Sequence, residues 1–383
     1  MIQYICLEKN CRRKGDTLLF IDEIQNSPQA VMQMRYFYEE LPDLFVIGAE
    51  PLLEISMDKR HVNFPVGRVE YRYLFPMTFE EFLQALGETQ ALDAFHTIPV
   101  PRYAEQKLME LFRLYTFVGG MPEAVVRYAE TKDLSQLSPV YESLLTAYKD
   151  DVSKYAKGGH ETDIIRHVIE STPAEVGNRI AFEHFGNSGY KSKEVGNALR
   201  TLERAMLLYL RYPVTGYALP LVPNLRRRPR LQFIDTGLLG YALGGQAAYF
   251  TEESLDALYA GKLAEQLVAQ ELMARSNTIC EKPLFWIREE KQSNAEVDFL
   301  TVNKGKVYPV EVKSGKNGTL RSLHEFINAS GNSLAVRLYS GTFSVEEART
   351  PVTSSNAARP YRLLNLPLFL ASQVNSYIEA YSK

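Results

Sequence analysis

Residues 296–313 read EVDFLTVNKGKVYPVEVK, and this stretch decides the fold we expect for the C-terminal part of the chain. Two alternating runs, 297–302 and 307–312, flank the turn sequence Asn303-Lys304-Gly305. Strand-like runs joined by a short Asn/Gly turn are typical of a β-hairpin. We therefore predict two antiparallel strands here.

Three charged side chains on this hairpin predict a metal site. Glu311 and Lys313 are two positions apart on one strand, so they point to the same face, and Asp298 on the other strand can oppose them. Two carboxylates can hold Mg²⁺, and an ammonium can position or deprotonate a water for attack on a phosphodiester. We predict Asp298 and Glu311 as metal ligands and Lys313 as a catalytic residue. Acid-x-Lys pairs also occur on exposed strands without function, but these strands are otherwise apolar.

The D-x(12)-E-x-K spacing of this hairpin resembles the core of the PD-(D/E)XK nuclease superfamily. The resemblance implies a restriction-endonuclease-like α/β domain over residues 248–383. It also implies a catalytic role for Glu265, because many members add an acid from an upstream helix. Residues 263–272 have the amphipathic pattern of such a helix. The fold and retained nuclease activity are separate predictions.

Residues 159–247 show the element order of a winged helix: helix, helix, turn, helix and hairpin. We expect a first helix up to Ser171 and a second one with Thr172 as its N-cap and Pro173 as its first residue. A third helix is expected over 192–205, and the strands over 207–214 and 231–234.

This region predicts DNA contacts. The third helix would enter the major groove, and an arginine-rich loop would hold phosphates. The alternative is a packing or protein-interaction module, since fold does not determine function. The candidate contacts are Lys191, Lys193, Arg200 and Arg204 near or on the helix, and Arg226, Arg227, Arg228 and Arg230 in the loop.

The N-terminal run TLLFIDE, residues 17–23, has the pattern of a Walker B strand. In open α/β sheets the C-terminal strand ends bind ligands. There Asp22 could hold the Mg²⁺ that bridges two phosphates, and Glu23 could orient the attacking water. A helix-like stretch over 29–40 and a second strand over 44–48 suit a βαβ unit. The alternative is a strand that ends in two surface acids.

Three segments together resemble a family of bacterial and archaeal AAA-type ATPases that carry a C-terminal domain of unknown function. They are LLFIDEIQ at 18–25, GRVEYRYLFPMTFEEFL at 67–83 and VGGMPEAV at 118–125. The resemblance implies a partial AAA-type core over 1–76 and a helical lid and connector over 77–158. It implies that Arg68 contacts a phosphate as an arginine finger, although Arg68 could equally pair with a carboxylate. At the sensor position, Ala49 and Glu50 stand where the family usually has a hydroxyl residue.

No G-x-x-x-x-G-K-[ST] motif occurs in the sequence, although the family would have one before the Walker B strand. Its backbone amides and lysine supply most of the triphosphate cradle. We therefore expect no autonomous ATP hydrolysis, and ATP binding only if a P-loop segment is supplied. Either the N-terminus is truncated or this member has abandoned hydrolysis. We also expect about 70 N-terminal residues to be mobile, covered by another segment or self-associated as a homo-oligomer, because a partial parallel sheet leaves unpaired backbone groups.

The charge, cysteine content and hydropathy of the sequence limit the classes of partner that we expect. A net charge of −3 argues against a surface that coats nucleic acid throughout but leaves room for a local basic patch. Three scattered cysteines, Cys6, Cys11 and Cys280, and the lack of H-E-x-x-H predict no zinc. The lack of a long apolar stretch predicts no membrane span and a cytoplasmic protein. We expect a multidomain α/β protein of the AAA-type ATPase family that acts on or near DNA through a Mg²⁺-dependent nuclease site. The alternative is a non-catalytic DNA- or protein-binding module with relic ATPase and nuclease sites.

Overall fold

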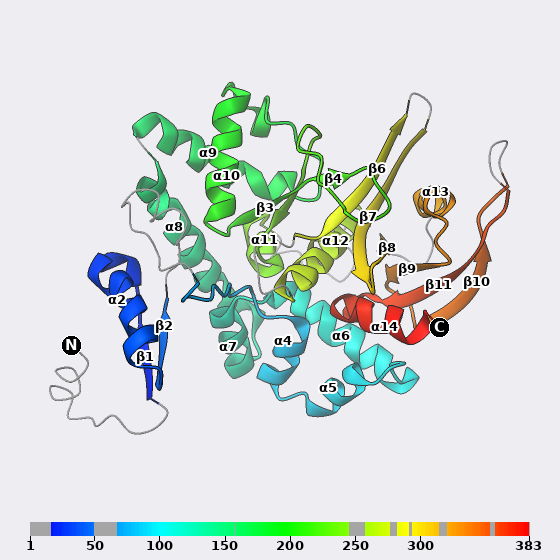
Figure 1. Ribbon diagram of the computed structural model, residues 1–383, viewed down its shortest axis with the longest axis horizontal. Helices are drawn as coiled ribbons and strands as arrows, with labels where there is room; N and C mark the ends of the chain where they lie inside the picture. The colour runs from blue at the N-terminus through cyan, green and yellow to red at the C-terminus, as the bar shows by residue number, and fades with distance from the viewer. Residues whose placement is uncertain are drawn as a thin grey trace. The chain divides into compact units, whose positions relative to one another are not determined.

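Two units divide the chain, residues 1–72 and residues 73–383. The computed structural model describes residues 17–49, 67–156, 158–244, 257–275, 282–290, 293–313, 320–352 and 357–382 (Figure 1). This part of the protein is mixed α/β, and its largest sheet has seven strands. No helix among these residues is long and apolar enough to cross a membrane. Glu50 and the three cysteines lie outside the described residues.

The first unit contains the predicted βαβ arrangement. Strand β1 (Thr17–Ile21) runs parallel to β2 (Leu44–Gly48), and a short 3-10 helix η1 (Ile24–Asn26) and helix α2 (Pro28–Glu40) connect them. Ser27 begins α2, because its side chain accepts from the Ala30 amide and Pro28 fixes the first helical residue. Gly48 lets the strand pack closely on η1, because a Cβ there would lie 2.7 Å from the Cδ1 of the buried Ile24 and that side chain would have to shift.

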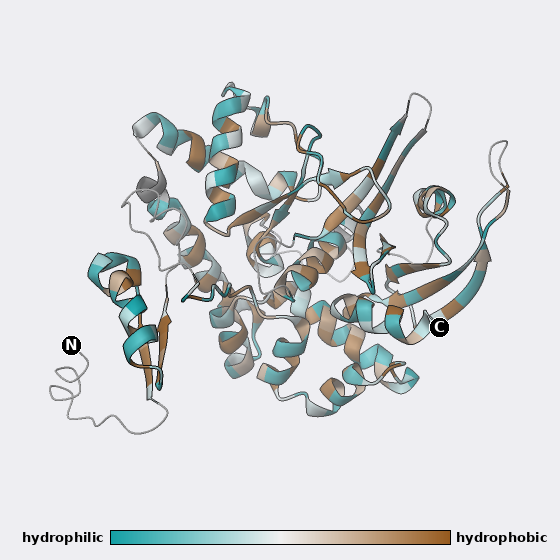
Figure 2. Cartoon of the chain, in the orientation of Figure 1, coloured by the Kyte–Doolittle hydropathy of each residue, from teal (hydrophilic) through white to brown (hydrophobic). Residues whose placement is uncertain are grey.

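One face of this strand pair packs on η1 and α2 and the other face is open. Ile24, Ala30 and Val31 form the small core with Ile21 and Met34. On the opposite face the strands carry four apolar side chains that are half or more exposed: Leu18 58%, Phe20 58%, Phe45 60% and Ile47 50%. The strands are largely brown in Figure 2. This strand pair therefore has an exposed apolar face.

We expect the amides of residues 18–21 to exchange with solvent much faster than those of residues 299–302. Among the described residues, strand β1 has one neighbouring strand and one exposed face, whereas residues 299–302 lie inside the seven-stranded sheet. Local opening costs less free energy where few contacts are buried. Hydrogen exchange followed by mass spectrometry measures the difference. Equal protection of the two segments in a monomer would contradict it.

The second unit begins with helices. A capping box starts the first of them, because Thr78 accepts from the Glu81 amide and Glu81 accepts from the Thr78 amide. Phe79, Phe82 and Tyr115 are fully buried where these helices meet. The helices are α4 (Phe79–Leu86), α5 (Thr89–His96), α6 (Arg102–Val118), α7 (Pro122–Thr131), η2 (Leu134–Leu137) and α8 (Ser138–Tyr155).

The first departure of residues 159–244 from the prediction concerns their first two helices. Helix α9 (Gly159–Glu175) continues through Pro173, so Thr172 is not the N-cap of a second helix and that prediction was wrong. The Thr172 hydroxyl instead donates to the Val168 carbonyl within the helix. The buried positions 164, 165, 168, 169, 172 and 173 keep helical spacing across the proline, and this packing outweighs the break. The further elements are η3 (Phe185–Asn187), α10 (Ser192–Arg204), β3 (Leu208–Arg211), β4 (Pro213–Val214), β5 (Arg230–Phe233) and α11 (Thr236–Ala242).

The single strand expected over 207–214 is two strands in different sheets. Strand β3 pairs antiparallel with β5, whereas β4 pairs parallel with β6 of the large sheet. Arg230, expected in the arginine-rich loop, is the first residue of β5. The middle region therefore supplies an edge strand to the C-terminal sheet.

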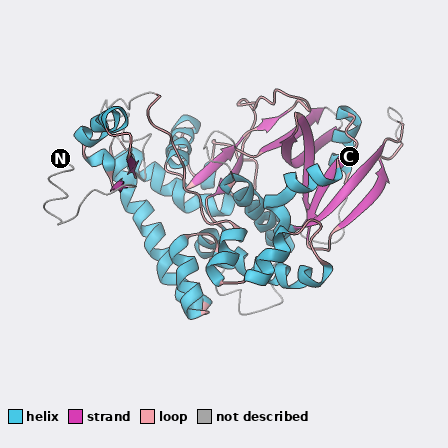
Figure 3. Ribbon diagram, turned by 60° about the horizontal axis from the view of Figure 1, so that its bottom comes forward, coloured by secondary structure: helices cyan, strands magenta, loops and turns pink. Residues whose placement is uncertain are grey.

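The C-terminal sheet has the strand order β10-β11-β9-β8-β7-β6-β4 (Figure 1), and its strands are drawn in magenta in Figure 3. The predicted hairpin is confirmed, because β7 and β8 pair antiparallel from Phe299–Val310 to Asn303–Lys306. Lys304 (φ 47°) and Gly305 (φ 77°) make the left-handed two-residue turn. The remaining pieces are α12 (Ala257–Ala274), β6 (Leu284–Glu290), β7 (Ser293–Asn303), β8 (Lys306–Lys313), α13 (Arg321–Ser330), β9 (Leu334–Tyr339), β10 (Ser344–Arg349), β11 (Pro360–Pro367), η5 (Leu368–Gln373) and α14 (Val374–Tyr381).

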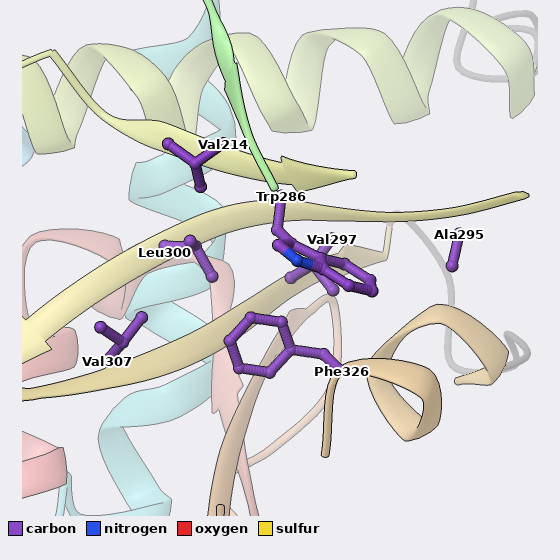
Figure 4. Close-up of a cluster of buried hydrophobic side chains, with 7 residues drawn as sticks. All are labelled: Val214, Trp286, Ala295, Val297, Leu300, Val307 and Phe326. Carbon is purple, nitrogen blue, oxygen red and sulfur yellow. The ribbon is translucent and has the colours of Figure 1, made fainter. Parts of the chain in front are cut away.

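A tryptophan anchors the sheet to α13. Trp286 is 1% exposed and its ring meets Phe326 of α13 edge to face, with the centroids 5.2 Å apart (Figure 4). Its indole nitrogen donates to the Thr215 carbonyl, so it also secures β4. The same cluster includes Val214, Ala295, Val297, Leu300 and Val307. This core sets the position of β7, and with it the carboxylates described next.

Candidate carboxylate and arginine site

Asp298 lies where β7 and β8 separate. The pairing of β6 with β7 shifts between Leu284–Leu300 and Trp286–Val297, so β7 has one extra residue here. Such a bulge redirects side chains at the edge of a ladder. The Asp298 carboxylate then accepts from the Val312 amide through Oδ2 at 2.9 Å. Asp298 is 6% exposed, so β8 holds a buried carboxylate at this point.

Glu311 and Lys313 lie together on β8, as their spacing predicts. Lys313 Nζ is 2.6 Å from Glu311 Oε1, and Glu311 is 5% exposed. The other oxygen, Oε2, is buried and has no hydrogen-bond partner among the described residues. A buried carboxylate oxygen without a donor is costly, and it is an available ligand atom.

Arg230 reaches from β5 into the same cluster. Its NH1 lies 2.5 Å from Oε2 of Glu265 on α12 and 3.3 Å from Asp298 Oδ1. Its Nε lies 2.7 Å from Glu296 Oε1, although the angle there is not that of a hydrogen bond, so this contact is an ion pair only. The side chain of Arg230 is 12% exposed. One guanidinium therefore contacts three carboxylates.

Burial, and after it the nearby charge of Asp298, raises the pKa values of Glu311 and Glu265. Burial and then the charge of Asp298 raise the pKa of Glu311 to about 8, against the opposing effect of Lys313. Burial and then Asp298 also raise the pKa of Glu265 to about 7, against Arg230. Burial acts to lower the pKa of Arg230, but Glu265, Asp298 and Glu296 outweigh it, so its pKa is raised. Glu311 thus holds a proton more readily than a free carboxyl does, as we expect for adjacent acids without a metal.

Arg211 supports the cluster through hydrogen bonds to backbone carbonyls. It is 1% exposed and donates from NH2 to the Asp298 carbonyl and from Nε to the Pro283 carbonyl, both at 2.8 Å. Its guanidinium lies 4.1 Å from the centroid of the Phe299 ring. Burial and then Arg230 lower its pKa to about 9. Arg211 thus ties β3 to the residue that carries the Asp298 carboxylate.

The donor set is suited to Mg²⁺, but this arrangement does not fit a bound ion. Carboxylates are hard oxygen ligands, and Glu311 Oε2 has no competing partner. Across the described ranges, however, no group of three or more acidic, histidine or cysteine side chains is placed to hold a metal. The guanidinium of Arg230 contacts both Glu265 and Asp298. The Mg²⁺ site therefore stays a prediction.

An arginine-lined hollow is linked to the cluster. It has a volume of about 390 Å³ and is lined by Arg179, Arg226, Arg227, Arg228 and Glu289. Glu289 pairs with Arg227 and, at 2.7 Å, with Arg179. Arg179 NH1 also lies 3.9 Å from Glu296 Oε2, and Glu296 pairs with Arg230. Ion pairs thus run from the hollow to Asp298.

Backbone hydrogen bonds hold the arginine loop in shape. Asn224 donates its amide to the Pro213 carbonyl and accepts from the Arg226 amide through its side chain. On the other side of the hollow, the Ile180 amide donates to the Pro229 carbonyl. The loop 224–229 is therefore tied at both ends.

The basic residues predicted at the third helix lie on its surface. Lys191 precedes α10 and Lys193, Arg200 and Arg204 lie within it, and all four are exposed. Lys193, Arg200 and Arg204 are seven and four positions apart, which places them on one face of the helix. The structure keeps this face accessible, and their DNA contacts stay predictions.

In the first unit, Asp22 and Glu23 follow the C-terminal end of β1, next to Ala49 at the end of β2. Glu23 has a left-handed backbone, and its amide donates to Asp22 Oδ1 at 3.0 Å. Arg68 pairs with Glu39 of α2 at 2.7 Å, which is the carboxylate alternative considered for it. The nucleotide roles of these residues stay predictions.

Four residues of the site were not found by sequence reasoning: Arg179, Arg211, Glu289 and Glu296. Glu296 had a signal, because it is two positions before Asp298 on the same strand. The other three depend on contacts between segments far apart in the sequence, and no local pattern identifies them.

Comparison with protein families gives three matches. Residues 2–83 match an AAA domain, residues 109–249 match a domain of unknown function, DUF8612, and residues 260–356 match another, DUF4143. A search of curated proteins found no match. The AAA and DUF4143 matches support an AAA-type ATPase-like family. Asp298, Glu311 and Lys313 lie within the DUF4143 match, whereas Arg230 lies within the DUF8612 match.

Proposed function

We propose that this ATPase-family protein binds the phosphate backbone of DNA in the arginine-lined hollow. In this proposal the Asp298–Glu311–Lys313 cluster next to the hollow is the centre that acts on a phosphodiester. The observation that carries the proposal is the chain of ion pairs that links the hollow, through Glu296 and Arg230, to Asp298. The basic face of α10 is a second proposed contact.

The charge of the hollow suits a polyanion. Four arginines and one glutamate line it, and no ion pair of Arg226 or Arg228 is present among the described residues. Both side chains are exposed, so a ligand can reach them without breaking existing pairs. Guanidinium groups bind phosphate oxygens in pairs of parallel hydrogen bonds, which a single surface ammonium cannot do.

Lys313 and Glu311 suit reactions at phosphorus. The ammonium lies against a carboxyl that is partly protonated near neutral pH, so the pair can carry or release a proton beside the strand. Asp298 is fixed by the Val312 amide and does not need to reorganise. These are the residues that would touch the reacting group.

We expect the double variant Arg226→Ala/Arg228→Ala to bind DNA more weakly and with less salt dependence. Each lost phosphate contact should reduce the slope of log K against log salt by about one unit. Fluorescence anisotropy with a labelled single strand and a duplex, in EDTA and over a salt series, measures both quantities.

The matched control is Arg113→Ala/Arg166→Ala, which removes the same charge from exposed helix positions away from the hollow. Equal loss in both double variants would mean that net charge alone is responsible and would refute the hollow as a site. The triple variant Lys193→Ala/Arg200→Ala/Arg204→Ala separates the α10 contact in the same titration.

A second candidate function is DNA binding without cleavage. The observation that favours it is Arg230, whose guanidinium contacts the carboxylates that would otherwise face a metal. Plasmid and single-stranded DNA incubated with Mg²⁺ or Mn²⁺ distinguish the two. Nicking that disappears in Lys313→Met supports the reactive centre, and intact DNA alongside tight binding supports the binding module.

A further inference from the structure

Arg230 carries a positive charge to the place in the cluster where a divalent cation would be needed. Glu265, Glu296 and Asp298 belong to two elements, α12 and β7, and Arg230 contacts all three from a third, β5. Like charges in a partly dehydrated cluster repel strongly unless a cation lies among them. Arg230 supplies that cation from within the chain.

The other cations near the cluster cannot replace it. Arg211 is directed at the Asp298 backbone carbonyl and the Pro283 carbonyl, not at a carboxylate. Within the described ranges, Lys313 forms an ion pair with Glu311 alone. Glu265 has an ion pair with Arg230 and no other among the described residues. Without Arg230, neither Glu265 nor Asp298 would have an ion pair among the described residues, and only the charges of Arg211 and Lys313 would still act on them from nearby.

Glu311 gives a second, independent indication of a cation site. Its Oε2 is buried without a hydrogen-bond partner among the described residues, next to the Asp298 carboxylate. This oxygen could bind a metal ion, and Arg230 does not contact it. The cluster thus has more carboxylate oxygens than its own basic residues engage.

We propose that Arg230 is the resident cation of this cluster and that it excludes divalent metal, so that metal binds Glu265, Asp298 and Glu311 only when Arg230 withdraws. This inference rests on the proposed function, because it concerns regulation of the same centre. Arg230 follows the loop 226–228 by two residues, and Arg179 of the hollow shares Glu296 with it. A ligand that moves this loop therefore acts directly on the residue that blocks the metal.

The test is metal binding by the full chain without DNA. Isothermal titration with MnCl₂ should show Arg230→Met binding Mn²⁺ roughly tenfold or more tightly than the wild type, because the competing cation is gone. Arg113→Met is the matched control, since it removes the same charge from an exposed position of α6 that belongs neither to the hollow nor to the carboxylate cluster, and it should behave as the wild type. Adding Glu311→Gln to Arg230→Met should abolish the gain.

Thermal unfolding gives a second measurement, which stays informative if Arg230→Met is destabilised in the absence of metal. In EDTA, Arg230→Met should melt below the wild type, and Mn²⁺ should restore most of the loss while leaving the wild type unchanged. Arg230→Lys, which keeps a single point charge, should bind Mn²⁺ with intermediate affinity. Wild type that binds Mn²⁺ as tightly as Arg230→Met would overturn the proposal, and so would Arg230→Met and Arg230→Lys that neither bind nor respond to Mn²⁺.

The two proposals fail separately. The metal titration contains no DNA, so its failure leaves the hollow as a DNA site. The anisotropy measurement is made in EDTA, so loss of the hollow leaves the competition between Arg230 and metal intact.

Discussion

Glu271→Gln should stabilise the protein near neutral and alkaline pH and have little effect at acid pH. Glu271 lies on α12 and is fully buried. Its Oε1 accepts from the Phe79 amide at 2.8 Å and from the Tyr115 hydroxyl at 2.9 Å. Its Oε2 is buried without a hydrogen-bond partner among the described residues. A glutamine keeps the accepting oxygen and removes the charge.

The buried environment of Glu271 makes its ionised form costly. The single Tyr115 hydroxyl proton is donated either to Glu271 or to the Met77 carbonyl, which lies 2.6 Å from the hydroxyl oxygen, and Gln270 donates to Tyr115 and Asp235. Glu271 has no ion pair with a basic side chain among the described residues, and burial raises its pKa to about 7. Asp235 in the same network is also fully buried, and burial raises its pKa to about 6.

The pH window follows from the two pKa values of Glu271. The unfolded chain loses this proton near the ordinary value of 4.5, whereas the folded protein keeps it until about pH 7. Between these values the unfolded state binds fewer protons, so stability falls as pH rises. The contribution is fully present below about pH 4.5 and is lost by about pH 7. The shift corresponds to a difference on the order of 3 kcal/mol, which is the upper limit of the gain in Glu271→Gln.

Urea unfolding of wild type and Glu271→Gln at about pH 5 and about pH 8 measures the effect. We expect a higher midpoint for the variant at the higher pH and similar midpoints at the lower one. Glu271→Ala is the control, because it leaves the Phe79 amide without its acceptor and should be less stable at both pH values. A Glu271→Gln variant that is less stable than wild type at the higher pH would show that the charge is satisfied in the fold.

The hairpin and the βαβ unit could be predicted because local patterns determine them. Alternating side chains over 297–302 and 307–312, with Lys304-Gly305 between them, favour a β-hairpin over other structures. Over residues 17–48, two short apolar runs joined by a helix-like stretch favour a βαβ unit. The spacing of Glu311 and Lys313 on one strand places their side chains together. Features that depend on neighbouring residues in the chain could therefore be predicted from the sequence.

The charges around the hairpin could not be predicted, because they come from distant segments. Arg211 is 87 residues from Asp298 and Arg230 is 68 residues from it, and nothing near either arginine indicates burial. Arg230 was grouped with Arg226–Arg228 because it is close to them in sequence, yet it starts a strand and turns toward the carboxylates. Pro173 is a similar case, since the buried face of α9 outweighs the local helix-breaking tendency.

Arg211→Met should destabilise the second unit more than any substitution of an exposed arginine. Arg211 bridges β3 to the Pro283 and Asp298 carbonyls, and its guanidinium carbon lies over the rings of Phe285 and Phe299, 5.6 and 4.1 Å from their centroids. Methionine has a similar length and can fill the space, so little cavity is left. The loss is electrostatic: two buried carbonyls lose their donors, and the carboxylates nearby lose a cation.

We expect a loss of roughly 3–5 kcal/mol for Arg211→Met, the range found when one partner of a buried charged arrangement is removed. Arg113→Met on the exposed face of α6 is the control and should change stability by no more than about 0.5 kcal/mol. Urea unfolding, followed by the fluorescence of Trp286 in the same sheet, measures both variants.

Arg211 also holds the backbone of Asp298, so the variant should loosen the carboxylate cluster as well, and Mn²⁺ should bind Arg230→Met more tightly than Arg211→Met/Arg230→Met. A loss below about 1 kcal/mol would mean that Phe285 and Phe299 close over the methionine and that the two carbonyls find other donors, which would place the stability of this region in its apolar packing and not in its buried charges.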